Sequence, residues 1–207
     1  YNFLNPALLA RAFIFFAYPS VISGDRVWIA ERADVHSGAT PLAEIMNDNI
    51  TQLPSMLELC IGNIPGSIGE TSKIAILIGA LILIVTRVAS TKIMLSTVAG
   101  GFIMGFIFNH IGSNPMMQIP VYEQLLMGGF LFGAVYMATD PVTAPHTSKG
   151  KIIYGLLIGI FAILIRTANK GYPEGMMLAI LLMNIFAPLI DYCVIQLNIR
   201  KRKLRAK

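Results

Sequence analysis

Long apolar runs separated by shorter polar connections dominate the chain, the pattern of a protein that crosses a membrane several times. A helix needs about 17 to 25 residues to cross roughly 30 Å of hydrocarbon. By this criterion a first helix runs from Pro6 to Ile22, and a long polar connection follows from Ser23 to Ser72. Five further spans are predicted: Lys73–Val88, Ile93–His110, Tyr122–Ala138, Lys151–Ala168 and Pro173–Ile199. The predicted fold class is therefore an all-α integral membrane protein, a multi-span helical bundle.

Composition supports this class and argues against a nucleic-acid partner. Hydrophobic residues make up 55% of the 207 residues and charged residues 13%, whereas soluble domains carry roughly 25% charged residues. The net charge is +5, but the last eight positions hold six of the 16 basic residues. These are Arg200, Lys201, Arg202, Lys203, Arg205 and Lys207. The basicity is thus a local tail, residues 200–207, that suits the cytoplasmic side of a lipid bilayer.

Basic residues also predict the orientation, because those flanking short loops favour the cytoplasm. Placing the basic tail inside and counting spans backwards puts Arg87 and Lys92 inside as well. The connection over residues 23–72 then lies on the outer face. Arg166 and Lys170 fall outside in this scheme, and an inside loop at that position would require one of the spans to be wrong.

A short motif in the outer connection points to flavin chemistry. Asp34 and the run Ser37-Gly38-Ala39-Thr40 spell D-x-x-S-G-A-T. This spacing resembles the site at which flavin transferases join FMN through its phosphate to a threonine hydroxyl. Small neighbours leave room for a bulky donor, and exposed loops suit modification. The alternative is a plain turn, because Ser-Gly followed by Thr-Pro is ordinary loop sequence.

Two segments interrupt the helical pattern in the same way. Asn5 precedes Pro6 near the start, and Thr139-Asp140 precedes Pro141 after the fourth span. A capping side chain before proline is typical of a helix start. Corresponding breaks in two halves of a membrane protein indicate internal repeats with a binding site between them. We expect the two breaks to approach one another at the cytoplasmic side; ordinary capped loops are the alternative.

Glycines recur within the spans at spacings of four, as in Gly101–Gly105, Gly129–Gly133 and Gly155–Gly159. Such pairs let helix backbones approach closely in lipid. The pattern predicts a compact bundle. A flat flavin ring against the same glycine faces is the alternative use of these residues.

Four blocks of sequence carry a resemblance to a known family. They are residues 5–13 (NPALLARAF), 37–42 (SGATPL), 137–144 (MATDPVTA) and 184–191 (NIFAPLID). Together they resemble the B subunit of the sodium-translocating NADH:quinone oxidoreductase and its relative, the D subunit of the Rnf complex. The order of the blocks agrees with the family, and they spread across nearly the whole chain. The chain is expected to cover the C-terminal half or so of such a protein.

The resemblance implies a fold of about ten transmembrane helices in two inverted repeats, similar to urea-transporter folds. Residues 1–22 would then be the last helix of the first repeat, 23–72 the outer connection, 73–199 a five-helix bundle and 200–207 the tail. It further implies covalent FMN on Thr40 as a phosphoester, with the loop on the periplasmic side of a bacterial inner membrane. The resemblance also implies a non-covalent riboflavin toward the cytoplasm. It implies ubiquinone as the electron acceptor and sodium as the expelled ion.

Partners follow from the same resemblance. They are the other subunits of a membrane redox complex and a flavin transferase. The sequence has no nicotinamide-binding fingerprint and no cysteine cluster, because Cys60 and Cys193 lie far apart. NADH is thus expected to be oxidised by another subunit. The riboflavin is expected to border Asn5, Thr139 and Asp140, because helix starts supply unpaired N–H donors to uncharged flavin edges.

Asp191 lies inside the final predicted span, where a carboxylate is costly unless it is functional or paired. One interpretation is an oxygen ligand on a sodium pathway, in the inner half of the membrane. The other is a structural partner for a buried polar group. Pro188 frees a backbone carbonyl nearby, so the two residues could share one polar pocket. Lys73 and Glu123, at span ends, are expected to be solvated or to snorkel.

Three rival interpretations of the whole chain stay open at this point. The first is the D subunit of the Rnf complex, because the sequence does not separate the two relatives decisively. A passive channel or transporter could share the inverted-repeat plan, with the S-G-A-T run a coincidence. A purely structural assembly subunit would carry neither flavin nor solute flux.

Overall fold

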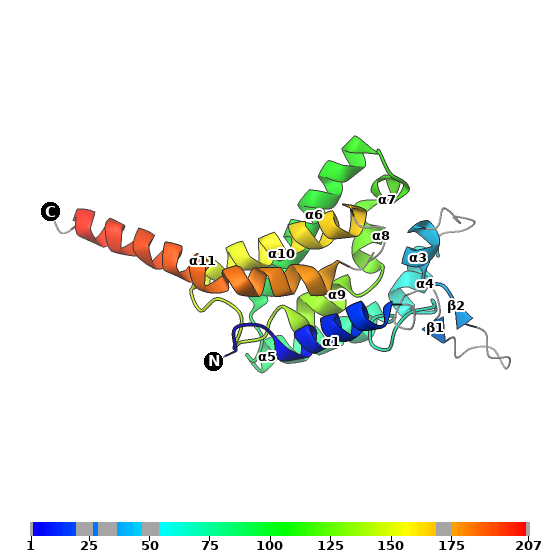
Figure 1. Ribbon diagram of the computed structural model, residues 1–207, viewed down its shortest axis with the longest axis horizontal. Coiled ribbons are helices and arrows are strands. Elements are labelled where there is room, and N and C mark those ends of the chain that lie inside the picture. Colours follow the sequence, from blue (N-terminus) through cyan, green and yellow to red (C-terminus); the bar gives the residue numbers. More distant parts are fainter. Residues whose placement is uncertain (1, 20–26, 29–36, 47–53, 169–174, 206–207) are drawn as a thin grey trace.

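The computed structural model describes residues 2–19, 27–28, 37–46, 54–168 and 175–205. Helices dominate these residues, and Figure 1 shows them as one elongated bundle. The elements are α1 (Pro6–Ala17), β1 (Val27–Trp28), β2 (Ser37–Gly38), α3 (Pro41–Met46), α4 (Met56–Ile61), α5 (Lys73–Val85), α6 (Thr91–Ile111), α7 (Pro115–Gln118), α8 (Val121–Leu126), α9 (Phe130–Phe132), the π-helix η1 (Gly133–Met137), α10 (Ser148–Ala168) and α11 (Met176–Arg205). The predicted all-α class is confirmed, with one short antiparallel strand pair, β1–β2, added to it.

Three of the described helices are long and apolar enough to cross a membrane: α6, α10 and α11. They coincide with three of the predicted spans. The helices α1 and α5 are apolar but shorter, with 12 and 13 residues. Their outer faces are apolar as well, since Leu77, Leu81 and Val85 on α5 are all exposed. These features make the chain a multi-pass membrane protein.

The first helix is shorter than predicted. It begins at Pro6 as expected but ends at Ala17, and residues 20–22 of the predicted span lie outside the described residues. Proline disfavours helical geometry at the residue before it, and Tyr18, which precedes Pro19, has φ −134° and ψ 57°. Pro19 therefore accounts for the early end.

The predicted span Tyr122–Ala138 is wrong as a single helix. Helix α8 ends at Leu126, Met127 is extended, and Gly128 has a φ of +63°, a conformation that favours glycine. A three-residue helix and the π-helix η1 complete the segment. Continuous apolar composition hid the break, because hydropathy does not register backbone direction.

Helices α6 and α10 form the most extensive contact in the described structure. A methyl group on Gly100 would overlap the backbone oxygen of Leu156, and one on Gly159 would overlap that of Thr97. The two backbones therefore touch, as predicted for G-x-x-x-G pairs in lipid. The structure supports the packing interpretation of these glycines.

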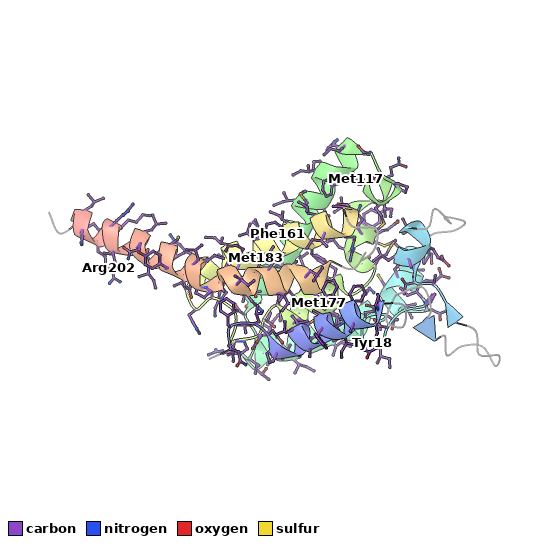
Figure 2. The ribbon with its side chains drawn as sticks, viewed as in Figure 1. Tyr18, Met117, Phe161, Met177, Met183 and Arg202 are labelled. Atoms are coloured by element: carbon purple, nitrogen blue, oxygen red, sulfur yellow. The ribbon has the colours of Figure 1, made fainter. Side chains whose placement is uncertain are left out.

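Three apolar cores hold the described elements together, and the third packs α5 against α6 and η1 through Ile76, Ala80, Met94 and Val135. The main core includes Phe130 after the break, Tyr154 and Ile158 on α10, and Ile180 and Met183 on α11. Figure 2 shows Met177 and Met183 on the part of α11 that lies against the bundle, whereas Arg202 lies on the part that projects away from it. The predicted tail thus continues α11 as an exposed helix as far as Arg205.

The second core is smaller and lies where α3, α4 and α7 gather at one end of the molecule (Figure 1). Its members are Leu42, Ile45, Leu59, Met116, Ile119 and Met127. Nearby, Ser55 caps α4: its backbone N–H donates to a Glu58 carboxylate oxygen at 2.8 Å. This bond and one from the Ser55 hydroxyl lower the pKa of Glu58. This core packs α3 against α4, α7 and the break after α8.

Candidate functional site

Thr40 lies at the junction between the strand β2 and the helix α3. Its side-chain oxygen accepts a hydrogen bond from the N–H of Ala43 at 3.3 Å, and Pro41 occupies the first helical position. This is the geometry of a helix N-cap. Thr40 is half-buried, and its hydroxyl hydrogen is not used by the capping bond. The hydroxyl is thus held in place by the backbone while one face stays open.

The rest of the D-x-x-S-G-A-T motif is described only in part. Ser37 and Gly38 form β2 and pair with Trp28 and Val27. Ala39 is half-buried beside Thr40, and Asp34 lies outside the described residues.

Thr40 lines a small, mostly uncharged cavity whose lining includes the charged residues Glu70 and Lys73. Gly128 lines the same space. The Lys73 side chain is only 2% exposed, and its ammonium donates to the backbone oxygens of Glu70 at 2.5 Å and Thr71 at 3.2 Å. The prediction of a solvated Lys73 is wrong, because backbone oxygens in the turn before α5 bind the ammonium inside the fold.

Arg166 is a second buried cation near this cavity, with a side chain 1% exposed. Its guanidinium donates to the backbone oxygen of Gln124, and to that of Met127 at 3.3 Å. These carbonyls lie at the C-terminal end of α8, where helix geometry leaves them without partners. The broken helix is therefore capped by an arginine from α10.

The burial of Arg166 removes it from the count of loop charges used to predict orientation. Sequence reasoning missed its role. The available signal was an arginine within the last turn of an apolar helix together with the Gly128-Gly129 pair, since one supplies donors and the other breaks a helix.

Glu123 also differs from its prediction. The residue is half-buried on α8, and its Oε2 atom is buried without a hydrogen-bond partner among the described residues. The first turn of α8 packs against α6 and α4, which removes this oxygen from the surface.

At the opposite end of the bundle the two proline breaks meet, as predicted. The Asn5 side-chain oxygen accepts from the N–H groups of Ala7 and Leu8 at 3.0 and 3.2 Å. The amide nitrogen of Asn5 donates to Asp140 Oδ2 at 3.3 Å, which joins segments 135 residues apart. One asparagine thus caps α1 and binds the second break.

The second break is not a helix start, contrary to the prediction. Asp140 caps a single turn, in which its carboxylate accepts from the Val142 N–H at 3.1 Å and the Thr143 hydroxyl at 2.9 Å. The next helix, α10, begins only at Ser148. Pro145 shortly after the turn disfavours its continuation.

A cleft of about 470 Å³ lies beside these breaks. Its lining combines hydrogen-bonding groups with apolar side chains: Asn2, Asn5, Pro6, Leu83, Val88, Ala89, Tyr136, Thr139, Asp140, Pro141 and Val142. The hydroxyl of Thr139 donates to the backbone oxygen of Val135 at 2.7 Å. The structure therefore brings Asn5, Thr139 and Asp140 to one site.

Asp191 binds the segment that leads into α10. One carboxylate oxygen accepts from the His146 N–H at 2.7 Å. The other accepts from the Thr147 N–H at 3.1 Å and from the Thr147 hydroxyl at 2.5 Å. These contacts match the alternative interpretation, in which Asp191 is a structural partner for polar groups. Asp191 and Pro188 also line one small cavity, as predicted.

The same cavity reaches a buried polar pair that sequence reasoning missed. The Tyr154 hydroxyl donates to the Asn184 side-chain oxygen at 2.6 Å, and both residues are at most 1% exposed. The Asn184 amide nitrogen is buried with no hydrogen-bond partner in the described part of the chain. In sequence, the signal was an asparagine within an apolar span.

These features define a helical membrane protein with broken helices and charged groups at both ends of its bundle. The chain belongs to the NQR2, RnfD, RnfE family, whose profile matches residues 1–200. The resemblance predicted from four sequence blocks is thereby confirmed.

Individual relatives agree with this membership. The chain is 54% identical over 214 aligned residues to the B subunit of the Na(+)-translocating NADH-quinone reductase of Klebsiella pneumoniae (strain 342), covering 99% of this chain and 52% of the relative. It is 51% identical to the protein of the same name from Chromohalobacter salexigens, with 99% and 50% covered, and 49% identical to that from Haemophilus influenzae, with 99% and 52% covered. The chain thus spans about half the length of the relatives it matches.

Proposed function

We propose that this chain is part of an electron-carrying membrane subunit of a sodium-translocating NADH:quinone oxidoreductase. Family membership and the names of the relatives support this assignment. The residues described offer no nicotinamide-binding fingerprint, so a partner subunit oxidises NADH and this chain receives the electrons. Ubiquinone accepts them at the end of the pathway, and the complex couples their passage to the expulsion of sodium.

Thr40 carries FMN through a phosphoester in this proposal. The supporting observation is the placement of its hydroxyl: fixed by the Ala43 bond, half-buried, and lining a cavity that contains the Lys73 ammonium. A transferase draws on a donor in which the FMN phosphate is an anhydride. The threonine oxygen bonds to phosphorus, the anhydride bond breaks, the other half of the donor leaves as a phosphate monoester, and the hydroxyl proton passes to solvent. The bound flavin then supplies reversible electron acceptance on the periplasmic side.

A denaturing gel of natively produced protein, viewed under ultraviolet light, tests this proposal. Covalent flavin survives denaturation, so the chain itself should fluoresce. A non-fluorescent band from a host with the transferase would favour the passive channel instead. A structural assembly subunit would also lack fluorescence, and a solute-flux measurement separates it from the channel.

The cleft between the two proline breaks is the proposed riboflavin site. Flavin pockets combine apolar walls with a few polar groups, and this cleft offers Asn5 and Asp140 among apolar neighbours. The basic end of α11 is proposed to lie on the cytoplasmic side of a bacterial inner membrane, and the cleft then lies on that side as well.

Asp191 is proposed to lie on the sodium pathway. The carboxylate lines a cavity together with Asn184 and Thr143, and oxygen atoms of this kind are ligands for hard cations. Its bonds to His146 and Thr147 fix its orientation toward the start of α10.

A further inference from the structure

The buried charge of Lys73 is only partly compensated in the described part of the chain, where the Glu70 carboxylate acts on it without a direct ion pair. Its side chain is 2% exposed, and no ion pair joins it to a carboxylate among the described residues. Its two hydrogen bonds go to the neutral backbone oxygens of Glu70 and Thr71. An ammonium has three donors, so one remains for another acceptor. A buried cation without a directly paired anion is costly, and a bound anion would lower that cost.

The surroundings of Lys73 add to the positive potential. The residue begins α5, whose first turn presents unpaired N–H groups and the positive end of the helix dipole. The guanidinium of Arg166 reaches the same region, since its Nη2 atom is 3.6 Å from where a side-chain carbon on Gly128 would lie. Gly128 and Lys73 line one cavity.

Glu70, the acidic residue of this cavity, has its carboxylate oriented away from a direct ion pair with Lys73. Its Oε1 atom accepts the Ser67 N–H at 2.9 Å. Its Oε2 atom lies 3.2 Å from where a side-chain carbon on Gly129 would stand, on the far side of the helix break. The Lys73 ammonium is thus left facing the cavity that Thr40 also lines.

We propose that Lys73 binds the phosphate of the flavin attached to Thr40, both while the bond forms and afterwards. This inference rests on the proposed flavin attachment at Thr40. A phosphodiester keeps one negative charge, and a charge-assisted hydrogen bond from a buried ammonium holds it well. During the reaction Lys73 would position the phosphorus for attack by the threonine oxygen. Afterwards it would bind the phosphodiester and hold it against the bundle.

The test compares Lys73→Met, which removes the charge, with Lys73→Arg, which keeps it. Lys92→Met is the matched control, because Lys92 also lies in the first turn of a membrane helix but is exposed. Each chain is produced without the transferase, purified in detergent, and supplied with transferase and flavin donor. In-gel fluorescence then gives the initial rate of attachment. On flavinylated protein, quenching of flavin fluorescence by neutral acrylamide reports exposure of the flavin.

We expect Lys73→Met to slow attachment about tenfold or more, the effect of one charged hydrogen bond. Its flavin should also be quenched more readily. Lys73→Arg should stay close to the parent chain in both measurements, and Lys92→Met should match it.

Equal rates and equal quenching for Lys73→Met and the parent chain would overturn the inference while the attachment at Thr40 stands. Equal losses in Lys73→Met and Lys73→Arg would also overturn it, because charge would not be what matters. A parent chain that takes up no flavin at all would instead refute the proposed function.

If Lys73→Met does not accumulate, the double variant Glu70→Gln/Lys73→Gln removes both charges of the cavity at once. Its reference is Glu70→Gln alone. Slower attachment in the double variant supports the role of Lys73, and equal rates reject it.

Discussion

The two ends of the bundle bind charged side chains through opposite kinds of backbone group. At the end that carries Thr40, cations are buried and bound by backbone oxygens: Lys73 by Glu70 and Thr71, and Arg166 by the end of α8. At the other end carboxylates are bound by backbone N–H groups. Asp140 binds that of Val142, and Asp191 binds those of His146 and Thr147.

Helix ends explain the contacts of Arg166 and Asp191, whereas the carbonyls that bind Lys73 belong to the turn before α5. A broken or finished helix exposes carbonyls at one end and N–H groups at the other, and each kind attracts the opposite charge. The chain uses these groups in place of counterions. The Thr40 end is thereby suited to an anionic phosphate, and the Asp140 and Asp191 end to cations or to uncharged polar ligands.

The strongest test of this comparison is Thr40→Val, which removes the hydroxyl and keeps the shape. Covalent flavin should disappear completely while the chain still inserts in the membrane, and in-gel fluorescence measures this. Ser37→Ala should be milder, because the Ser37 side chain is assigned to loop shape and transferase recognition. Fluorescence retained in Thr40→Val would move the attachment to Ser37 or elsewhere.

Arg166→Leu should have the next largest effect, on stability. It leaves the carbonyls of Gln124 and Met127 without donors in the interior, a loss of about 3 kcal/mol. Thermal unfolding in detergent measures the change, with the exposed Arg202→Leu as control. A melting temperature shared by the two variants would mean that the helix break does not depend on its arginine.

Asp191→Ala tests the other end. The proposed sodium role predicts unchanged flavin content and a weaker dependence of quinone reduction on sodium. Activity of the assembled complex, titrated with sodium chloride, measures this. Loss of flavin or of assembly would show that the bonds to His146 and Thr147 are what Asp191 provides, and an unchanged sodium response would reject the pathway role.

Asn5→Ala should have the smallest effect. Loss of the cap of α1 costs about 1 kcal/mol, and loss of the bond to Asp140 loosens the contact between the two breaks. Non-covalent flavin released by mild denaturation should fall while gel fluorescence from Thr40 is retained. Asn2→Ala is a suitable control, since Asn2 lines the cleft but caps no helix. Equal non-covalent flavin in the two variants would remove Asn5 from the riboflavin site.

Periodicity and proline positions predicted a large part of this architecture. The spans that became α6, α10 and α11 are long apolar runs, and the cap at Asn5 follows from local sequence. The meeting of the two proline breaks was predicted from their similarity. Local chemistry was sufficient in these cases because each feature depends on neighbouring residues.

The features that escaped prediction depend on distant partners. Lys73 and Arg166 have the sequence context of solvated end charges, and only the fold shows that carbonyls surround them. The break at Gly128 lies in an unbroken apolar run, so hydropathy could not reveal it. Asp34 lies outside the described residues, and its assignment remains a prediction.

The backbone contact between α6 and α10 holds these two helices rigidly together. With Gly100 pressed on Leu156 and Gly159 on Thr97, neither helix has room to slide or roll. In the proposed electron-carrying role, an electron that crosses from one end of the bundle to the other would therefore meet the same gap at every turnover.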